Sequence, residues 1–190
     1  MKSVTAILAI AAASTTVPGA AVAPAAGANV ITDAAHNMTL VLDVDDTGKI
    51  PVWRLVLDET TALRQRSELE TESSEFASVA SAPALNRRAD PPQCSRNHAA
   101  RADDCKMLYK NIQWSEAAVP NSPRHIVYGR CYISWSKAFS GQLRAFYWPA
   151  YNTVETCTWW ADYWAVSGLV KNAQGQGVTQ CLSGRASNCS

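Results

Sequence analysis

The sequence predicts an α+β fold in which two helices pack against a short antiparallel sheet in a small disulfide-stapled domain. All six cysteines follow the dipeptide Arg87-Arg88, and segments with helical and strand-like apolar patterns alternate beyond it. A hydrophobic leader and an acidic stretch precede that dipeptide. We therefore expect a signal peptide at residues 1–23, an acidic pro-region with a β-hairpin at residues 24–88, and a mature cysteine-rich domain at residues 89–190.

The first residues have the order of a secretory signal peptide. Lys2 supplies a positive charge, residues 4–13 are apolar except for Thr5, and Ala21-Val22-Ala23 offers small residues for cleavage. The apolar run is shorter than the roughly 20 residues that span a bilayer. The sequence therefore predicts a secreted, extracellular protein without a membrane span.

The pro-region and the mature segment differ in net charge. Residues 27–86 carry four basic and ten acidic side chains, a net charge of −6, whereas residues 89–190 carry ten basic and six acidic ones, a net charge of +4. The whole-chain value of +1 conceals this asymmetry. Residues 68–84, rich in Glu, Ser and Ala, are typical of a linker. Arg87-Arg88 after that linker is the cut site expected for a dibasic processing protease of the secretory pathway.

The pro-region contains Asp43-Val44-Asp45-Asp46-Thr47, which matches the start of the nucleophile strand in haloacid-dehalogenase-like phosphatases. We favour a β-hairpin instead. Residues 38–44 and 50–57 are rich in β-forming residues, and Asp45-Asp46-Thr47-Gly48 between them is ordinary turn chemistry. About 40 residues before the cysteines are also too few for a doubly wound domain. Asn37 begins a glycosylation sequon at the start of this hairpin, so the protein is expected to be a glycoprotein.

The cysteines predict disulfides rather than a metal site. None of them forms a Cys-x-x-Cys pair or a Cys/His cluster with zinc spacing, and a secreted chain is oxidised. Six cysteines allow fifteen pairings, among which the sequence does not choose. No metal and no cofactor is expected. The six are Cys94, Cys105, Cys131, Cys157, Cys181 and Cys189.

Apolar periodicity predicts the elements of the mature segment. The first helix has an apolar stripe at Met107, Leu108 and Ile112, near Cys105, with Asp103-Asp104 in its first turn. The second places Cys157, Trp160 and Trp164 on one side. The expected elements are a helix at 99–114 capped by Asn97, strands at 125–135 and 142–148, a helix at 153–164 and a strand at 175–183.

Four stretches of the mature segment form a distinctive set: Ala102-Asp103-Asp104-Cys105, Cys131-Tyr132-Ile133-Ser134-Trp135-Ser136, Ser167-Gly168-Leu169-Val170-Lys171-Asn172 and residues 179–189. They resemble a family of small secreted fungal proteins with a fungal "WD-like" domain. The resemblance implies a secreted, cysteine-rich, effector- or toxin-like protein, and the family offers no established catalytic residues to carry over. A more distant resemblance is to necrosis-inducing effectors and killer toxins of fungi. We expect the likeness to extend from about Cys94 to Cys189 and to exclude the pro-region.

Exposed aromatic side chains predict that the mature domain works by binding. Six of the seven tryptophans lie in it, and exposed aromatic rings are typical of contacts with proteins, sugars and membrane interfaces. We expect Trp135, Trp160 and Trp164 in the core. The candidate binding residues are Trp148, Trp159, Tyr163 and Tyr151.

Two other functions are open to the sequence. A cell-wall glycan could stack on the aromatic rings, which would make the domain a glycan-binding module. A small secreted ribonuclease could use His98 and His125, with Glu116 between them in sequence, for acid–base cleavage. The net charge of +4 is too dilute to predict nucleic-acid binding. We expect a non-catalytic protein that binds an unknown protein or a cell-surface glycan.

Overall fold

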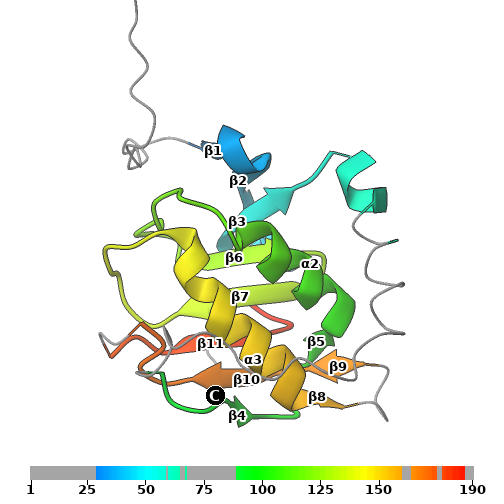
Figure 1. Ribbon diagram of the computed structural model, residues 1–190, viewed down its shortest axis with the longest axis vertical. Helices are drawn as coiled ribbons and strands as arrows, with labels where there is room; N and C mark the ends of the chain where they lie inside the picture. Colours follow the sequence, from blue (N-terminus) through cyan, green and yellow to red (C-terminus); the bar gives the residue numbers. More distant parts are fainter. Residues whose placement is uncertain are drawn as a thin grey trace, which may run out of the picture.

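The computed structural model describes residues 29–58, 60–64, 67, 89–159, 164–174 and 177–186. The predicted signal peptide, the dipeptide Arg87-Arg88 and the side chains of Trp160, Tyr163 and Cys189 lie outside these residues. Within the described part, the chain forms an α+β fold with one large sheet, one small sheet and two main helices (Figure 1).

The large sheet has eight strands in the order β1-β2-β3-β6-β7-β11-β10-β4. Its neighbouring strands are antiparallel except for β3 and β6, which run parallel. It is thus larger than the short antiparallel sheet that we predicted, and it is mixed. The strands are β1 (Val30–Asp33), β2 (Met38–Val44), β3 (Pro51–Val56), β4 (Gln93–Cys94), β6 (His125–Tyr128), β7 (Cys131–Trp135), β10 (Gly168–Val170) and β11 (Gln180–Ser183).

The predicted hairpin is confirmed as the pair β2 and β3, and it belongs to this sheet. The carboxylate of Asp45 closes the turn by accepting hydrogen bonds from the Thr47 hydroxyl at 2.7 Å and from the backbone N–H groups of Lys49 and Ile50. Asp43 is paired instead with Arg54 across the hairpin, at 2.6 Å. The Asp-x-Asp motif therefore serves the turn and the strand pairing.

The second sheet is small, with three strands in the order β5-β9-β8. These strands are β5 (Ala100–Arg101), β9 (Ala165–Val166) and β8 (Thr158–Trp159). Figure 1 shows it beside the ends of β10 and β4, below the N-terminal end of the first main helix.

The first main helix, α2 (Ala102–Ile112), is shorter than predicted at both ends. It begins at Ala102 because the two preceding residues are paired in β5, so Arg101 takes the N-cap position instead of Asn97. Asp103 and Asp104 do fall in its first turn, where the helix dipole favours acidic groups. The predicted apolar stripe is confirmed as the buried side of this helix.

Our predictions for residues 142–164 are only partly confirmed: residues 153–157 are helical as predicted, but the helix begins earlier, at Tyr147, and ends at Cys157. Residues 142–148 are not a strand: a 3-10 turn, η3 (Leu143–Phe146), runs directly into the second main helix, α3 (Tyr147–Cys157). Pro149 is compatible with this because the first turn of a helix has no intrahelical acceptor for its N–H. The helix ends at Cys157 because Thr158 is extended and enters β8, so Trp164 does not share a helical face with Cys157.

The predicted strand at 125–135 is a hairpin of two strands. Gly129 adopts a left-handed conformation, with φ of 54°, and with Arg130 it reverses the chain between β6 and β7. Cys131, Ile133 and Trp135 are buried as expected, like every residue of β7. The last predicted strand is confirmed in its second half, as β11.

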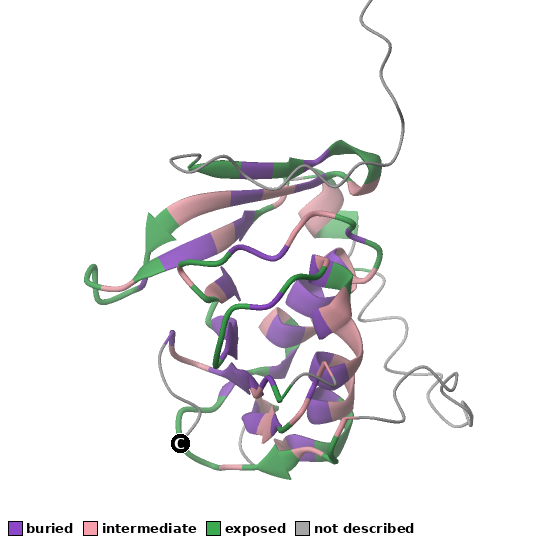
Figure 2. Ribbon diagram, turned by 90° about the vertical axis from the view of Figure 1, so that its left-hand side faces the viewer, coloured by how far each residue is buried: buried purple, intermediate pink, exposed green. Residues whose placement is uncertain are grey.

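Both main helices cover one face of the large sheet, and the main core lies between the two layers (Figures 1 and 2). Phe146 is fully buried there and packs against Trp135 and Phe139, with ring centroids 4.8 and 5.4 Å away. A smaller apolar cluster on the opposite face joins Val52, Val127, Tyr132 and Ala186.

Two disulfides tie this fold together. Cys94 of β4 is bonded to Cys157 at the end of α3, and Cys105 of α2 is bonded to Cys131 at the start of β7. Cys181 is also disulfide-bonded, and Cys189, the remaining cysteine of the chain, lies outside the described residues.

Candidate functional site

Aromatic side chains gather along α3, on its outer side and on its flank toward α2. Ala150, Val154 and Cys157 turn toward the core, so helical geometry places Trp148 on the opposite side of the helix. Tyr147 and Tyr151 lie between these two sides and pack, partly buried, against the edge of the core. These three side chains are half-buried. We call them the α3 aromatic surface.

The rings of this surface support one another. The Trp148 ring meets the rings of Tyr147 and Tyr151 edge-on, at centroid distances of 5.0 and 5.6 Å. Tyr147 and Tyr151 are stacked at 6.0 Å. Beneath them, the buried Tyr109 of α2 touches both tyrosines edge-on, at 5.6 and 5.8 Å. Rings that are already packed in this way lose little side-chain freedom when a ligand binds.

The phenol group of Tyr151 on this surface is neutral. Burial raises the pKa of Tyr151, and the charge of Glu155, one helical turn away, raises it further. The hydroxyl of Tyr151 therefore stays protonated throughout the physiological range and can donate or accept a hydrogen bond beside the rings. The surface thus offers both apolar ring area and polar tips to a ligand.

The four predicted binding residues do not form one site. Trp148 and Tyr151 meet on the α3 aromatic surface, and Tyr163 lies outside the described residues. Trp159 belongs to β8, beyond the opposite end of a helix that is about 16 Å long. Its half-buried ring faces the guanidinium of Arg96, which is 6.0 Å from the ring centroid.

Two further aromatic side chains are exposed, Trp164 and Trp114. The prediction that Trp164 is a core residue is wrong: it is 38 % exposed, and its ring contacts the ammonium group of Lys106 at 5.4 Å. Trp114, just past the end of α2, is 64 % exposed. Its position beyond the apolar stripe was the signal in the sequence that this side chain lies outside the core. Trp135 is buried as predicted.

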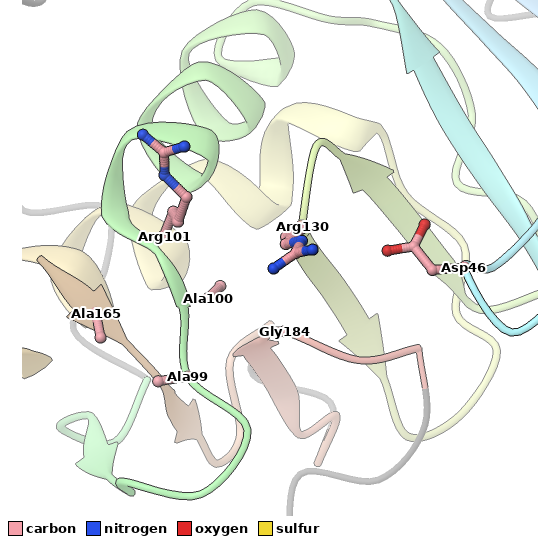
Figure 3. Close-up of a pocket in the computed structure, with 7 residues that line it drawn as sticks. All are labelled: Asp46, Ala99, Ala100, Arg101, Arg130, Ala165 and Gly184. Carbon is pink, nitrogen blue, oxygen red and sulfur yellow. The ribbon is translucent and has the colours of Figure 1, made fainter. Parts of the chain in front are cut away.

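A hollow of about 380 Å³ lies near the N-terminal end of α2 (Figure 3). Arg130, in the turn between β6 and β7, lies between Ala100 and Asp46 in this view. Its backbone N–H donates to Asp104, and within the described residues its guanidinium makes no ion pair. Within the described part of the chain, the hollow therefore offers a guanidinium without an ion pair, from Arg130, and the carboxylate of Asp46. Its lining residues are Asp46, Ala99, Ala100, Arg101, Arg130, Ala165 and Gly184.

The structure gives the two histidines separate environments. His125 is half-buried in β6, where its Nδ1 lies 3.1 Å from the Ser134 hydroxyl. Burial lowers its pKa, and the charge of Arg124 lowers it further. His98 lies in an exposed loop with φ of 55°, and Glu116 is paired with Arg144 at 3.3 Å. Among the described residues, no hydrogen bond joins the two histidines to each other or to Glu116.

Asn37, the predicted glycosylation site, lies on the surface. It occupies a left-handed turn between η1 (Ala34–His36) and β2, and its side chain is exposed. The amide Nδ2 donates hydrogen bonds to Asp58 at 3.2 Å and to Thr61 at 3.4 Å. A glycan attached to Nδ2 would leave a single N–H there, so at least one of these two contacts would be lost.

The described part of the chain holds no group of three or more His, Cys, Asp or Glu side chains that could bind a metal ion. Of the helices in that part, none has the length and apolar character needed to cross a membrane.

Comparison with known proteins supplies one match. The model of the fungal WD-like family matches residues 54–189, which is most of the chain. The chain belongs to the fungal WD-like family. The resemblance predicted from the cysteine-containing motifs is therefore confirmed. The prediction that it excludes the pro-region is wrong, because the match begins at Arg54, in the middle of β3. No curated protein and no solved structure matches the chain.

Proposed function

We propose that this fungal WD-like protein is a secreted, disulfide-stabilised, effector- or toxin-like protein that acts by binding a surface or a protein target, without catalysis. The observation that carries the proposal is the α3 aromatic surface, in which the half-buried Tyr147, Trp148 and Tyr151 lie ring against ring along α3. Aromatic residues are enriched at binding interfaces because they bury much area at little entropic cost.

The disulfides support the extracellular part of this proposal. Disulfides persist in oxidising compartments and are rare in the cytosol. Cys94–Cys157 and Cys105–Cys131 each connect a helix to the large sheet. Such cross-links suit a protein that must keep its binding surface intact outside the cell.

A cell-wall glycan is the second candidate target. Pyranose rings present flat apolar faces that stack on aromatic rings, and the tyrosine hydroxyls beside them can bond to sugar hydroxyls. The α3 aromatic surface combines the two features, which makes glycan binding a specific form of the proposed function.

The test is binding of the full-length secreted protein to insoluble cell-wall polysaccharides and to intact plant and fungal cells. The variants Trp148→Ala and Tyr151→Ala should lose at least about tenfold in affinity, since one buried aromatic contact is worth more than 1 kcal/mol. Trp114→Ala is the control, because Trp114 is 64 % exposed and, among the described residues, its ring does not contact Tyr147, Trp148 or Tyr151. The proposal fails if Trp148→Ala, Tyr151→Ala and Trp114→Ala bind as the unaltered protein does.

A further inference from the structure

We propose that residues 29–58 are a permanent part of the working protein, and that they stay bound to residues 89–186 without a covalent link after a cut at Arg87-Arg88. The cleavage product would then be a two-chain protein rather than a free cysteine-rich domain. The proposal rests on the contacts between the N-terminal strands and the rest of the sheet, and it does not depend on the target of the protein.

The first contact is made by the backbones of β3 and β6. These strands pair in parallel, with Trp53 opposite Ile126 and Arg54 opposite Val127. Without the N-terminal strands, β6, which now lies inside the sheet, would become its outermost strand. Its backbone N–H and C=O groups would be open to pairing with other chains, which proteins generally prevent.

The second contact is apolar and lies on both faces of the sheet. On the helical side, Leu40, Trp53 and Leu55 are at most 3 % exposed and belong to the same core as Leu108 and Ile112 of α2. Removing the N-terminal strands would expose this apolar side of α2 to water. The free energy lost would be about 25 cal/mol for each Å² of apolar surface exposed.

On the opposite face, the fully buried Val52 packs with Val127, Tyr132 and Ala186. The strand β3 is therefore covered on two sides by residues that come from beyond Arg88. Strands that are buried on both faces are typical of the centre of a sheet. A segment that is removed on maturation is not expected to contribute such a strand.

The third contact is polar. The carboxylate of Asp33 in β1 accepts hydrogen bonds from the Ser115 hydroxyl and from the backbone N–H of Glu116, both at 2.9 Å. Ser115 is fully buried. A buried donor that loses its partner costs about 1–3 kcal/mol, so this contact also favours retention of the N-terminal strands.

The N-terminal strands also complete the hollow near α2. Asp46, in the turn between β2 and β3, forms one wall of it, opposite residues that follow Arg88. Asp46 also acts on the Tyr132 hydroxyl: burial raises the pKa of Tyr132, the charge of Asp46 raises it further, and a hydrogen bond with the Asp46 backbone partly offsets both effects. The hollow exists in its present form only while residues 29–58 are bound.

The association has to be non-covalent, because all six cysteines of the chain follow Arg88. The test uses the full chain with a sequence-specific protease site in place of Arg87-Arg88. After complete cleavage, checked on a denaturing gel, size-exclusion chromatography in native buffer should give one peak that contains both fragments. In concentrated urea the two fragments should separate. Separation in native buffer would overturn the proposal, whether the larger fragment stays soluble or aggregates.

Two variants of the cleaved protein provide a matched comparison. Leu40→Ala removes a fully buried side chain of β2, whereas Val56→Ala removes one that is 46 % exposed at the end of β3. The N-terminal fragment should dissociate from Leu40→Ala at a clearly lower urea concentration than from Val56→Ala. Equal dissociation of both variants would show that the core contacts do not hold the fragment, and the proposal would be wrong.

Discussion

The carboxylate of Asp33 and the hydroxyl of Ser115 form a buried hydrogen bond of 2.9 Å across 82 positions of sequence. This bond joins the first strand of the large sheet to the segment just after α2. It connects the acidic, cysteine-free part of the chain before Arg87-Arg88 to the basic, cysteine-containing part after it. The two parts therefore belong to one fold.

The stability of this contact should depend on pH. Burial alone would raise the pKa of Asp33, but hydrogen bonds from Ser115, His36 and the Glu116 backbone outweigh burial, and the pKa is lowered below its usual 3.8. A carboxyl group with a lowered pKa in the folded state stabilises the fold above about pH 4 and ceases to do so as the pH falls through the folded value.

Asp33→Asn should therefore lower the free energy of unfolding by roughly 1.5–3 kcal/mol at neutral pH, the usual contribution of hydrogen bonds to a charged group. The difference from the unaltered protein should shrink at an acidic pH well below 4, as the pH falls through the lowered pKa of Asp33. Urea unfolding at both pH values measures it. An equal difference at the two pH values would mean that the charge of Asp33 plays no part.

Removal of the disulfides should have unequal effects. The Cys94–Cys157 bond closes a separation of 63 residues and the Cys105–Cys131 bond one of 26. Chain entropy then predicts losses of roughly 4 and roughly 3.5 kcal/mol. We expect Cys94→Ala/Cys157→Ala to have the lower melting temperature of the two double variants. The opposite order would show that contacts in the folded state, rather than loop length, set the contribution of each bond.

Peptide mapping of the unreduced protein checks the pairing itself. It should recover the peptides joined through Cys94–Cys157 and Cys105–Cys131. Cys181 is disulfide-bonded, so we expect its peptide joined to the one that contains Cys189, the only cysteine left. A peptide that joined Cys181 to Cys131 would contradict the fold around α2.

Substitutions at two glycines with positive φ, Gly129 and Gly48, distinguish the cost of backbone strain from the cost of steric crowding. A Cβ on Gly129 would lie 2.6 Å from the carboxyl group of Asp104, whereas one on Gly48 would meet nothing within 4 Å. Both substitutions to Ala incur the backbone strain of a left-handed conformation, about 1–3 kcal/mol. Gly129→Ala should be the more destabilising in thermal unfolding because it also displaces Asp104 from its bond to the Arg130 backbone. Equal losses would show that Asp104 moves away without cost.

The ribonuclease alternative has its own test. His98 and His125 have different surroundings and no hydrogen bond connects them among the described residues. We expect no cleavage of RNA by the secreted protein, and no change in target binding in His98→Ala or His125→Ala. RNA cleavage that disappears in both variants, while circular dichroism shows an unchanged fold, would revive the enzymatic function.

Local patterns predicted several elements correctly. The stripe at Met107, Leu108 and Ile112 marked the buried side of α2. The turn residues from Asp45 to Gly48 marked the hairpin of β2 and β3, because the chemistry of a tight turn is contained in a few adjacent residues.

The failed predictions share a physical cause, which is that distant parts of the chain decide them. The pairing of β5 with β9 delays the start of α2, and the bond of Cys157 to Cys94 lies where α3 ends. The parallel pairing of β3 with β6 cannot be predicted from the residues of either strand, since it joins segments about 70 residues apart. The candidate surface could be predicted only in part: Trp148 and Tyr151 meet because they are on one turn of α3, a helix that the alternating pattern of residues 142–148 concealed.

The most direct test of this account is the mass of the naturally secreted protein under native and denaturing conditions. We predict that the native mass includes residues 29–58 in every case. If the chain is cut at Arg87-Arg88, the denaturing mass should show two fragments whose sum, apart from the water added at the cut, is the native mass. A native species that contains only residues after Arg88 would contradict the account, because the eight-stranded sheet could not then be the working form of the protein.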